Sequence, residues 1–138
     1  MSNRKAYQIL ENLGRAIHRL NAALQETYIN SLSIDGTIFR FKVTIELYWK
    51  TLKRLLELEG LEARTPKESL KKAYVAGWIE NEEAWLQMLH DRKETSHVYD
   101  EDTAYKIYKN IQKNFQELER TYNGLLKHFS YLNDSETS

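Results

Sequence analysis

Residues 100–129 read DEDTAYKIYKNIQKNFQELERTYNGLLKHF and contain the longest apolar pattern of the chain. Large apolar side chains recur there at steps of three and four residues, which places them on one face of an α-helix. The stripe consists of Tyr105, Tyr108, Ile111, Phe115, Leu118, Tyr122, Leu125 and Phe129. Its strict period favours a packed core for the tyrosines over a base-stacking surface. The acidic residues at 100–102 suit the positive end of a helix dipole, so this long helix is predicted to begin there.

Two other long stretches have the same helical period. A first helix is predicted over roughly residues 4–29 and a second over roughly residues 34–59. The stripe of the first comprises Leu10, Leu13, Ile17, Leu20, Leu24 and Tyr28. The second has a main stripe of Ile34, Ile38, Phe41, Ile45, Tyr48, Leu52 and Leu55, and an additional apolar line of Phe39, Val43, Leu47, Trp49 and Leu56. A helix that is apolar on more than one side is usually central in its fold or lies in a dimer interface.

The middle of the chain contains two further helix starts. Residues 65–68, Thr-Pro-Lys-Glu, combine a capping threonine, a proline at the first helical position and a glutamate three residues after the cap. The short third helix is predicted to reach about residue 79. Its inward-facing residues are expected to be Leu70, Ala73, Tyr74, Gly77 and Trp78. Asn81 is the predicted N-cap of a fourth helix, and Gly60 the predicted C-cap of the second.

These stretches together predict an all-α protein. The chain has one proline and five glycines in 138 residues, and it lacks the alternation of apolar and polar residues that indicates a strand. The expected architecture is an up-and-down antiparallel helical bundle of four long helices plus one short helix. We expect one domain over residues 1–138, with a frayed polar tail from about residue 133.

Composition limits the kinds of partner and site. Lysine plus arginine and aspartate plus glutamate both number 20, so the formal net charge is zero. No broad positive field therefore attracts nucleic acid, and any RNA contact should be local, at a cleft. A net charge near zero is also compatible with self-association into a homodimer.

Several classes of site are not expected. The chain has no cysteine, which rules out disulfides and thiol chemistry. Its histidines show no metal-ligand spacing and no glycine-rich phosphate loop occurs, so neither a metal nor a cofactor is predicted. The polar N-terminus does not resemble a signal peptide, and no stretch approaches the roughly 20 apolar residues of a membrane span. We expect a cytoplasmic protein.

The fourth helix ends in a cluster of reactive residues, RKETSHVY at 92–99. Arg92 follows Ala84, Trp85, Met88 and Leu89 at the next position of their apolar stripe, where a charge must be paired or face a cleft. Tyr99 returns to nearly the same face, whereas His97 lies roughly 140° around a straight helix from Arg92. Arg92 and His97 therefore converge only if the helix ends near His97 or a second copy of the chain completes the site.

The order Arg92, four residues, His97, one residue, Tyr99 resembles the signature of HEPN domains, specifically their HepT-like branch, also known as the nucleotidyltransferase substrate-binding family. Residues 35–53 look like the second helix of that family, and residues 65–74 like the start of its third helix. Residues 91–104 look like its signature segment, and the likeness extends over residues 5–130.

The resemblance implies a helical bundle that dimerises so that two motifs face each other across a cleft. It also implies a metal-independent endoribonuclease in which Arg92 and His97 act on the phosphodiester. A small nucleotidyltransferase encoded beside such a protein would silence it by transferring AMP to Tyr99. Relatives often have Asn or Asp directly after the arginine, whereas this chain has Lys93, which can contact a phosphate.

Arg92 and His97 also have plain structural interpretations. Arg92 can extend from the helix end and pair with Asp91 or Glu94, although its planar fork of donors also matches two phosphate oxygens. His97 can bond a carbonyl at the helix end, although imidazole is well suited to moving the 2′-hydroxyl proton of RNA.

The remaining candidates depend on their surroundings. Tyr99 is a packing residue unless its hydroxyl is accessible beside a cleft. Glu46 is either solvent-facing beside the stripe or a buried partner that orients Arg92 or His97. Ser96 is either a phosphate contact or an ordinary hydroxyl at a helix end, and we favour the latter.

Two functions therefore remain open. In the first, the homodimer is a ribonuclease toxin with Arg92 and His97 catalytic and RNA as substrate. In the second, it is a non-catalytic substrate-binding subunit of a nucleotidyltransferase. Lys93 and the neutral overall charge favour the second, and the Arg–His–Tyr set favours the first.

Overall fold

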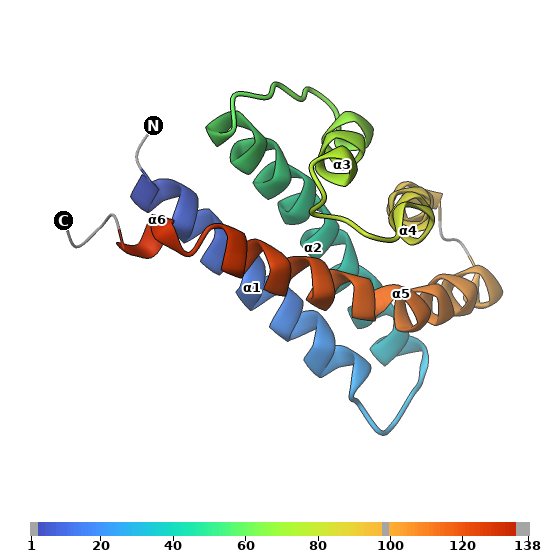
Figure 1. Ribbon diagram of the computed structural model, residues 1–138. Helices are drawn as coiled ribbons and strands as arrows, with labels where there is room; N and C mark the ends of the chain where they lie inside the picture. Colours follow the sequence, from blue (N-terminus) through green and yellow to red (C-terminus); the bar gives the residue numbers. More distant parts are fainter. Residues whose placement is uncertain (1–2, 98–99, 135–138) are drawn as a thin grey trace.

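The computed structural model describes residues 3–97 and 100–134, and this part of the chain is helical throughout, without a strand (Figure 1). The elements in order are α1 (Asn3–Leu24), α2 (Ser31–Leu58), α3 (Pro66–Val75), α4 (Glu82–Glu94), the 3₁₀ turn η1 (Thr95–His97), α5 (Glu101–His128) and α6 (Tyr131–Asp134). The predicted all-α bundle is confirmed. The fourth helix, however, has only 13 residues and is not one of the long ones.

α2 is the central helix of the bundle. It contacts α1, α3, α4 and α5, and Figure 1 shows α3 and α4 to one side of it and α1 to the other. The two apolar lines of α2 explain this position, because each needs a covering neighbour. The covering is incomplete, since Phe39 remains 62% exposed and Val43 40% exposed.

The core joins α2, α4 and α5 through one aromatic contact. Tyr48 of α2 and Trp85 of α4 are both buried, and their rings meet edge to face with centroids 4.6 Å apart. The Tyr48 hydroxyl donates a hydrogen bond of 2.8 Å to the carbonyl oxygen of Leu118 on α5. Burial raises the pKa of Tyr48 well above its ordinary value, so the hydroxyl stays a donor. This contact fixes the helix that leads to Arg92.

The predicted first helix boundary is wrong. α1 ends at Leu24, and Tyr28 is 73% exposed in the following loop. The next helix begins earlier than predicted because the Asn30 side chain accepts the Ser33 backbone N–H, while the Ser33 hydroxyl accepts the Asn30 backbone N–H. This reciprocal cap ends the loop at residue 30 and stabilises the first turn of α2.

Other boundaries differ by a few residues. Gly60 and Gly77 have φ angles of 78° and 86°, in the left-handed region that glycine adopts without strain and that ends a helix. Gly60 directly follows the C-cap Glu59 of α2, within one residue of the predicted C-cap. α3 ends at Val75, before its predicted end at about residue 79. Tyr74 and Tyr105, expected in the core, are more than 40% exposed because they lie at the edges of their stripes. Residues 131–134 form α6, which overlaps the start of the tail predicted from about residue 133; residues 135–138 lie outside the described residues.

Candidate functional site

α4 carries the motif arginine to the surface beside α2. Its N-terminus is capped by Asn81, whose side chain accepts the Ala84 backbone N–H at 3.0 Å. Trp85 and Met88 are buried and hold the helix on the core. The α-helix ends at Glu94, where the Thr95 hydroxyl donates a 2.6 Å hydrogen bond to the Arg92 carbonyl oxygen. The chain therefore leaves α-helical geometry two residues after Arg92, in the turn that contains His97, which is where one of the two predicted alternatives places the helix end.

Arg92 is paired with a carboxylate on α2. Its Nη2 lies 3.0 Å from Oε2 of Glu46, and the two side chains are 26% and 39% exposed. Glu46 is therefore a partner of Arg92, but a partly exposed one and not the buried carboxylate of the prediction, and Arg92 has no ion pair with Asp91 or Glu94 among the described residues. A guanidinium has five N–H donors; the ion pair engages Nη2, Nε is buried without a hydrogen-bond partner, and the side chain as a whole is partly exposed.

Asp91, next to Arg92, bonds to a different helix. The side chain is buried, and its Oδ1 accepts hydrogen bonds from Gln87 Nε2 at 3.0 Å and from Asn110 Nδ2 of α5 at 3.3 Å. Its Oδ2 is buried without a hydrogen-bond partner. Burial raises the pKa of Asp91, and the two hydrogen bonds oppose this shift. Consecutive residues of α4 are therefore held by α5 and by α2, which fixes the rotation of the helix about its axis.

The sequence interpretation missed the burial of Asp91. A usable signal was present, because Ala84, Met88 and Asp91 follow one another at steps of four and three residues, on the buried face of α4. A carboxylate at such a position needs hydrogen-bond partners. Only the folded structure shows that Asn110 of α5 supplies one.

Arg92 lies on the wall of a pocket of about 760 Å³ between α2, α3 and α4, here called the motif pocket. Its apolar lining is Ile45, Trp49, Pro66, Leu86 and Leu89, and its polar lining is Glu46, Thr65, Lys67, His90, Arg92 and Lys93. Three cations thus oppose one carboxylate. This combination of apolar walls and excess positive charge suits an anionic ligand with a flat apolar part, such as a nucleotide.

The remaining predicted residues lie at or beyond the edge of this pocket. Lys93 is exposed and lines it, whereas His97 and Ser96 are exposed on η1 and do not. No hydrogen bond or ion pair joins His97 to Arg92 within the described part of the chain. Tyr99 lies outside the described residues. Among the described residues, one chain therefore brings Arg92, Glu46 and Lys93 to the motif pocket, whereas His97 does not line it.

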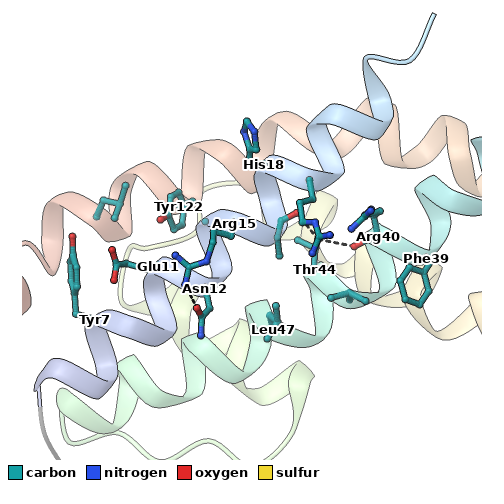
Figure 2. Close-up of a pocket in the computed structure, with 15 residues that line it drawn as sticks. Tyr7, Glu11, Asn12, Arg15, His18, Phe39, Arg40, Thr44, Leu47 and Tyr122 are labelled. Carbon is teal, nitrogen blue, oxygen red and sulfur yellow. Dashed lines mark hydrogen bonds between the residues drawn. The ribbon is translucent and has the colours of Figure 1, made fainter.

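A larger pocket of about 930 Å³ lies along α1, between α2 and α5 (Figure 2). Tyr7, Glu11 and Tyr122 lie toward one end in Figure 2, and Phe39 and Arg40 toward the other. None of the motif residues lines it. The chemistry of the motif therefore belongs to the smaller pocket, and the larger one needs a separate explanation.

Across residues 3–97 and 100–134, no cluster of three or more histidine, aspartate or glutamate side chains is arranged to hold a metal ion. Among the helices of the same part of the chain, none is both long and apolar enough to cross a membrane.

Comparisons with known proteins agree with the helical fold. The chain is 29% identical over 93 residues to a probable ribonuclease HepT of Haemophilus influenzae, a match that spans 64% of this chain and 64% of that protein. A Thermus thermophilus protein of known crystal structure is 28% identical, with a TM-score of 0.76, over 82% of this chain and 98% of the other.

The family itself is identified by a match over most of the chain. Residues 8–127 match the family described as nucleotidyltransferase substrate binding protein like. This range contains α2, α3, α4 and nearly all of α5, and hence every described residue of the motif. The match confirms the resemblance seen in the sequence: the chain belongs to the nucleotidyltransferase substrate-binding protein-like family and has a HepT-like HEPN domain.

Proposed function

We propose that this protein is a metal-independent endoribonuclease that acts as a homodimer. The observation that carries the proposal is the Arg92–Glu46 pair, which holds a partly exposed guanidinium on the wall of a cationic pocket. The relative named a probable ribonuclease supports the same activity. Within the described part of one chain, no hydrogen bond or ion pair joins His97 to Arg92. A second copy of the chain would bring another His97 to each motif.

The motif supplies the two groups that this reaction needs, an imidazole that moves protons and a guanidinium that binds the phosphate. The 2′-hydroxyl oxygen of the RNA attacks the adjacent phosphorus, and the P–O5′ bond breaks to give a 2′,3′-cyclic phosphate and a 5′-hydroxyl. His97 takes the 2′-hydroxyl proton, and a protonated imidazole, that of the second copy, gives one to the leaving 5′-oxygen. Arg92 stabilises the extra negative charge on the phosphorane, and Glu46 holds the guanidinium in place.

The proposed control is covalent modification by a separate nucleotidyltransferase. The Tyr99 hydroxyl oxygen would attack the α-phosphorus of ATP, forming a tyrosyl–phosphate bond and releasing pyrophosphate. The family description, which names nucleotidyltransferases, supports this partnership. AMP at Tyr99 would place a bulky anion two residues from His97, where it competes with the RNA phosphate.

The second candidate is a non-catalytic substrate-binding subunit. Two observations favour it. His97 does not line the motif pocket that contains Arg92, and the family description names substrate binding. In this alternative the motif pocket presents an anionic group to the nucleotidyltransferase, and no bond is cleaved by this chain.

Cleavage of single-stranded RNA in excess EDTA tests the first candidate, with wild type compared with His97→Ala. We expect cyclic-phosphate products from the wild type and at least a hundredfold slower cleavage by the variant. The matched control is His128→Ala, which removes a histidine at the end of α5 that lines neither of the two pockets described above and should retain cleavage. No cleavage by folded, unmodified wild type would favour the binding subunit.

The dimer and the modification have separate tests. Light scattering should give twice the chain mass of 16.4 kDa. Incubation with the nucleotidyltransferase and ATP should raise the intact mass by one AMP per chain, and Tyr99→Phe should abolish the increase. An unchanged increase in Tyr99→Phe would move the modification to another residue.

A further inference from the structure

The larger pocket has an uncompensated cationic end. Arg19 of α1 and Arg40 of α2 both line it, and neither guanidinium makes a hydrogen bond or ion pair among the described residues. Glu11 is the sole acidic residue in the lining, and it lies toward the Tyr7 end (Figure 2). The Thr44 hydroxyl of α2 donates a hydrogen bond to the Ala16 carbonyl oxygen of α1. Arg19 follows Ala16 by about one helical turn and Arg40 precedes Thr44 by about one, so across this helical hairpin both arginines lie toward the Phe39 end of the pocket. This end, here called the arginine groove, therefore attracts anions locally in a chain whose net charge is zero.

Phe39 adds an aromatic surface to this groove. Phe39 is 62% exposed, and in Figure 2 it lies toward the same end of the pocket as Arg40, its neighbour in the sequence. An exposed aromatic ring beside unpaired arginines is the combination that binds single-stranded nucleic acid, because bases stack on the ring while guanidinium groups bind the phosphates.

α2 connects the arginine groove to the motif pocket. Phe39, Arg40 and Val43 line the first, whereas Glu46 and Trp49 line the second. Phe39 and Glu46 are seven residues apart and so lie on nearly the same face of α2, roughly 10 Å apart along its axis. A strand stacked at about 3.4 Å per nucleotide covers this distance with roughly three nucleotides.

We propose that the arginine groove binds the nucleotides that flank the cleavage site of a single-stranded RNA. Arg19 and Arg40 contact two phosphates, and Phe39 stacks on one base. This inference rests on the proposed ribonuclease function and extends it, since it assigns single-stranded RNA as the substrate class and gives the substrate a second contact outside the motif.

The test measures RNA binding without cleavage. A fluorescein-labelled single-stranded RNA of about 12 nucleotides, within the usual range of site sizes, is titrated with the His97→Ala protein, and fluorescence anisotropy is followed from about 50 to 200 mM salt. Arg19→Ala/Arg40→Ala and Phe39→Ala are then introduced into the same background. The matched control is Lys113→Ala/Lys127→Ala, which removes the same charge from exposed positions on α5. Thermal melting of each variant establishes that it is folded.

The arginine variant should weaken binding at least tenfold at low salt, and the slope of log K against log salt should become shallower by about 1.4, at about 0.7 for each lost phosphate contact. Phe39→Ala should weaken binding roughly fivefold or more without changing the slope. The lysine control should bind RNA with the same affinity and the same salt slope as the His97→Ala protein that has no further substitution. Equal affinities and slopes for the arginine variant and the lysine control would overturn the inference.

Three further outcomes decide between this inference and the proposed function. If the wild type cleaves RNA in EDTA and the arginine variant in the otherwise wild-type chain cleaves with the same kcat/KM, the ribonuclease stands and the groove does not bind substrate. If the arginine variant also changes from dimer to monomer in light scattering, the groove is a subunit interface and the inference is wrong. Absence of both cleavage and binding by the wild type would overturn function and groove together.

Discussion

The two halves of α4 are held in place by different kinds of contact. The first half, residues 82–88, is capped by Asn81 and buries Trp85 against Tyr48. The second half, residues 89–94, contains Asp91 and Arg92, which bond to α5 and α2 through polar groups. Apolar burial contributes several kcal/mol to stability, whereas exposed ion pairs contribute about 0–1 kcal/mol. The first half therefore keeps the helix folded, and the second half positions the motif.

The largest expected effect comes from removing the apolar contact. Trp85→Ala should lower the free energy of unfolding by about 3–5 kcal/mol, because it leaves a cavity beside Tyr48. Chemical denaturation followed by circular dichroism measures this change. Leu86→Ala, at an exposed position of the same helix, is the control and should change stability little. A small effect of Trp85→Ala would mean that the polar half holds α4 on its own.

Substitution of Arg92 should separate activity from stability. Arg92→Ala should lower kcat for RNA cleavage by about 10²–10³-fold, the loss typical of a group that stabilises transition-state charge. Arg92→Lys should recover little of this activity, because the ammonium lacks the planar fork. The unfolding free energy should change by about 1 kcal/mol or less in both variants. Full activity of Arg92→Lys would show that charge alone is needed at this position.

Glu46 should act through Arg92. Glu46→Gln should lower kcat roughly tenfold to a hundredfold with a smaller change in KM, because the guanidinium loses its fixed position while substrate binding elsewhere persists. The matched control is Glu57→Gln, which removes the carboxylate of another α2 ion pair, with Arg54 at 3.9 Å. If both variants lose activity equally, the effect is one of general charge and not of positioning.

Asp91→Asn should have the smallest effect of these substitutions. At neutral pH it should leave the free energy of unfolding equal to or above that of the wild type. Burial raises the pKa of Asp91 in the folded chain, so the folded state binds this proton more tightly than the unfolded state. Its contribution to stability therefore falls as the pH rises from the ordinary carboxyl range through the raised pKa. In Asp91→Asn this fall should be absent, and the variant should be at least as stable as the wild type at neutral pH.

Denaturation midpoints measured from acidic to neutral pH follow this dependence. Asp35→Asn, at an exposed position of α2, is the control and should keep the wild-type pH dependence. Lower stability of Asp91→Asn at every pH would show that the ionised carboxylate stabilises the folded chain through Gln87 and Asn110.

Much of the fold could be predicted from the sequence because helix period, capping residues and turn glycines are local signals. The stripe from Tyr108 to Phe129, the cap at Thr65 and the turn at Gly60 all match the structure. The loop after α1 was predicted as helix because Tyr28 continues the apolar period, and period alone does not reveal the competing cap at Asn30. The predicted burial of Tyr74 and Tyr105 was wrong for a related reason, since amphipathic side chains at the edge of a stripe can be exposed.

The sequence by itself determined that the chain is helical, which residues form the apolar stripes, and that Arg92 interrupts one of them. Only the tertiary structure decided which carboxylate meets that arginine, because Glu46 and Arg92 belong to helices whose mutual rotation depends on core packing far from either residue. It also decided that Asp91 is buried against α5 and that unpaired arginines of α1 and α2 share one groove. Local propensities determine each helix, whereas contacts between helices depend on how all the stripes pack together.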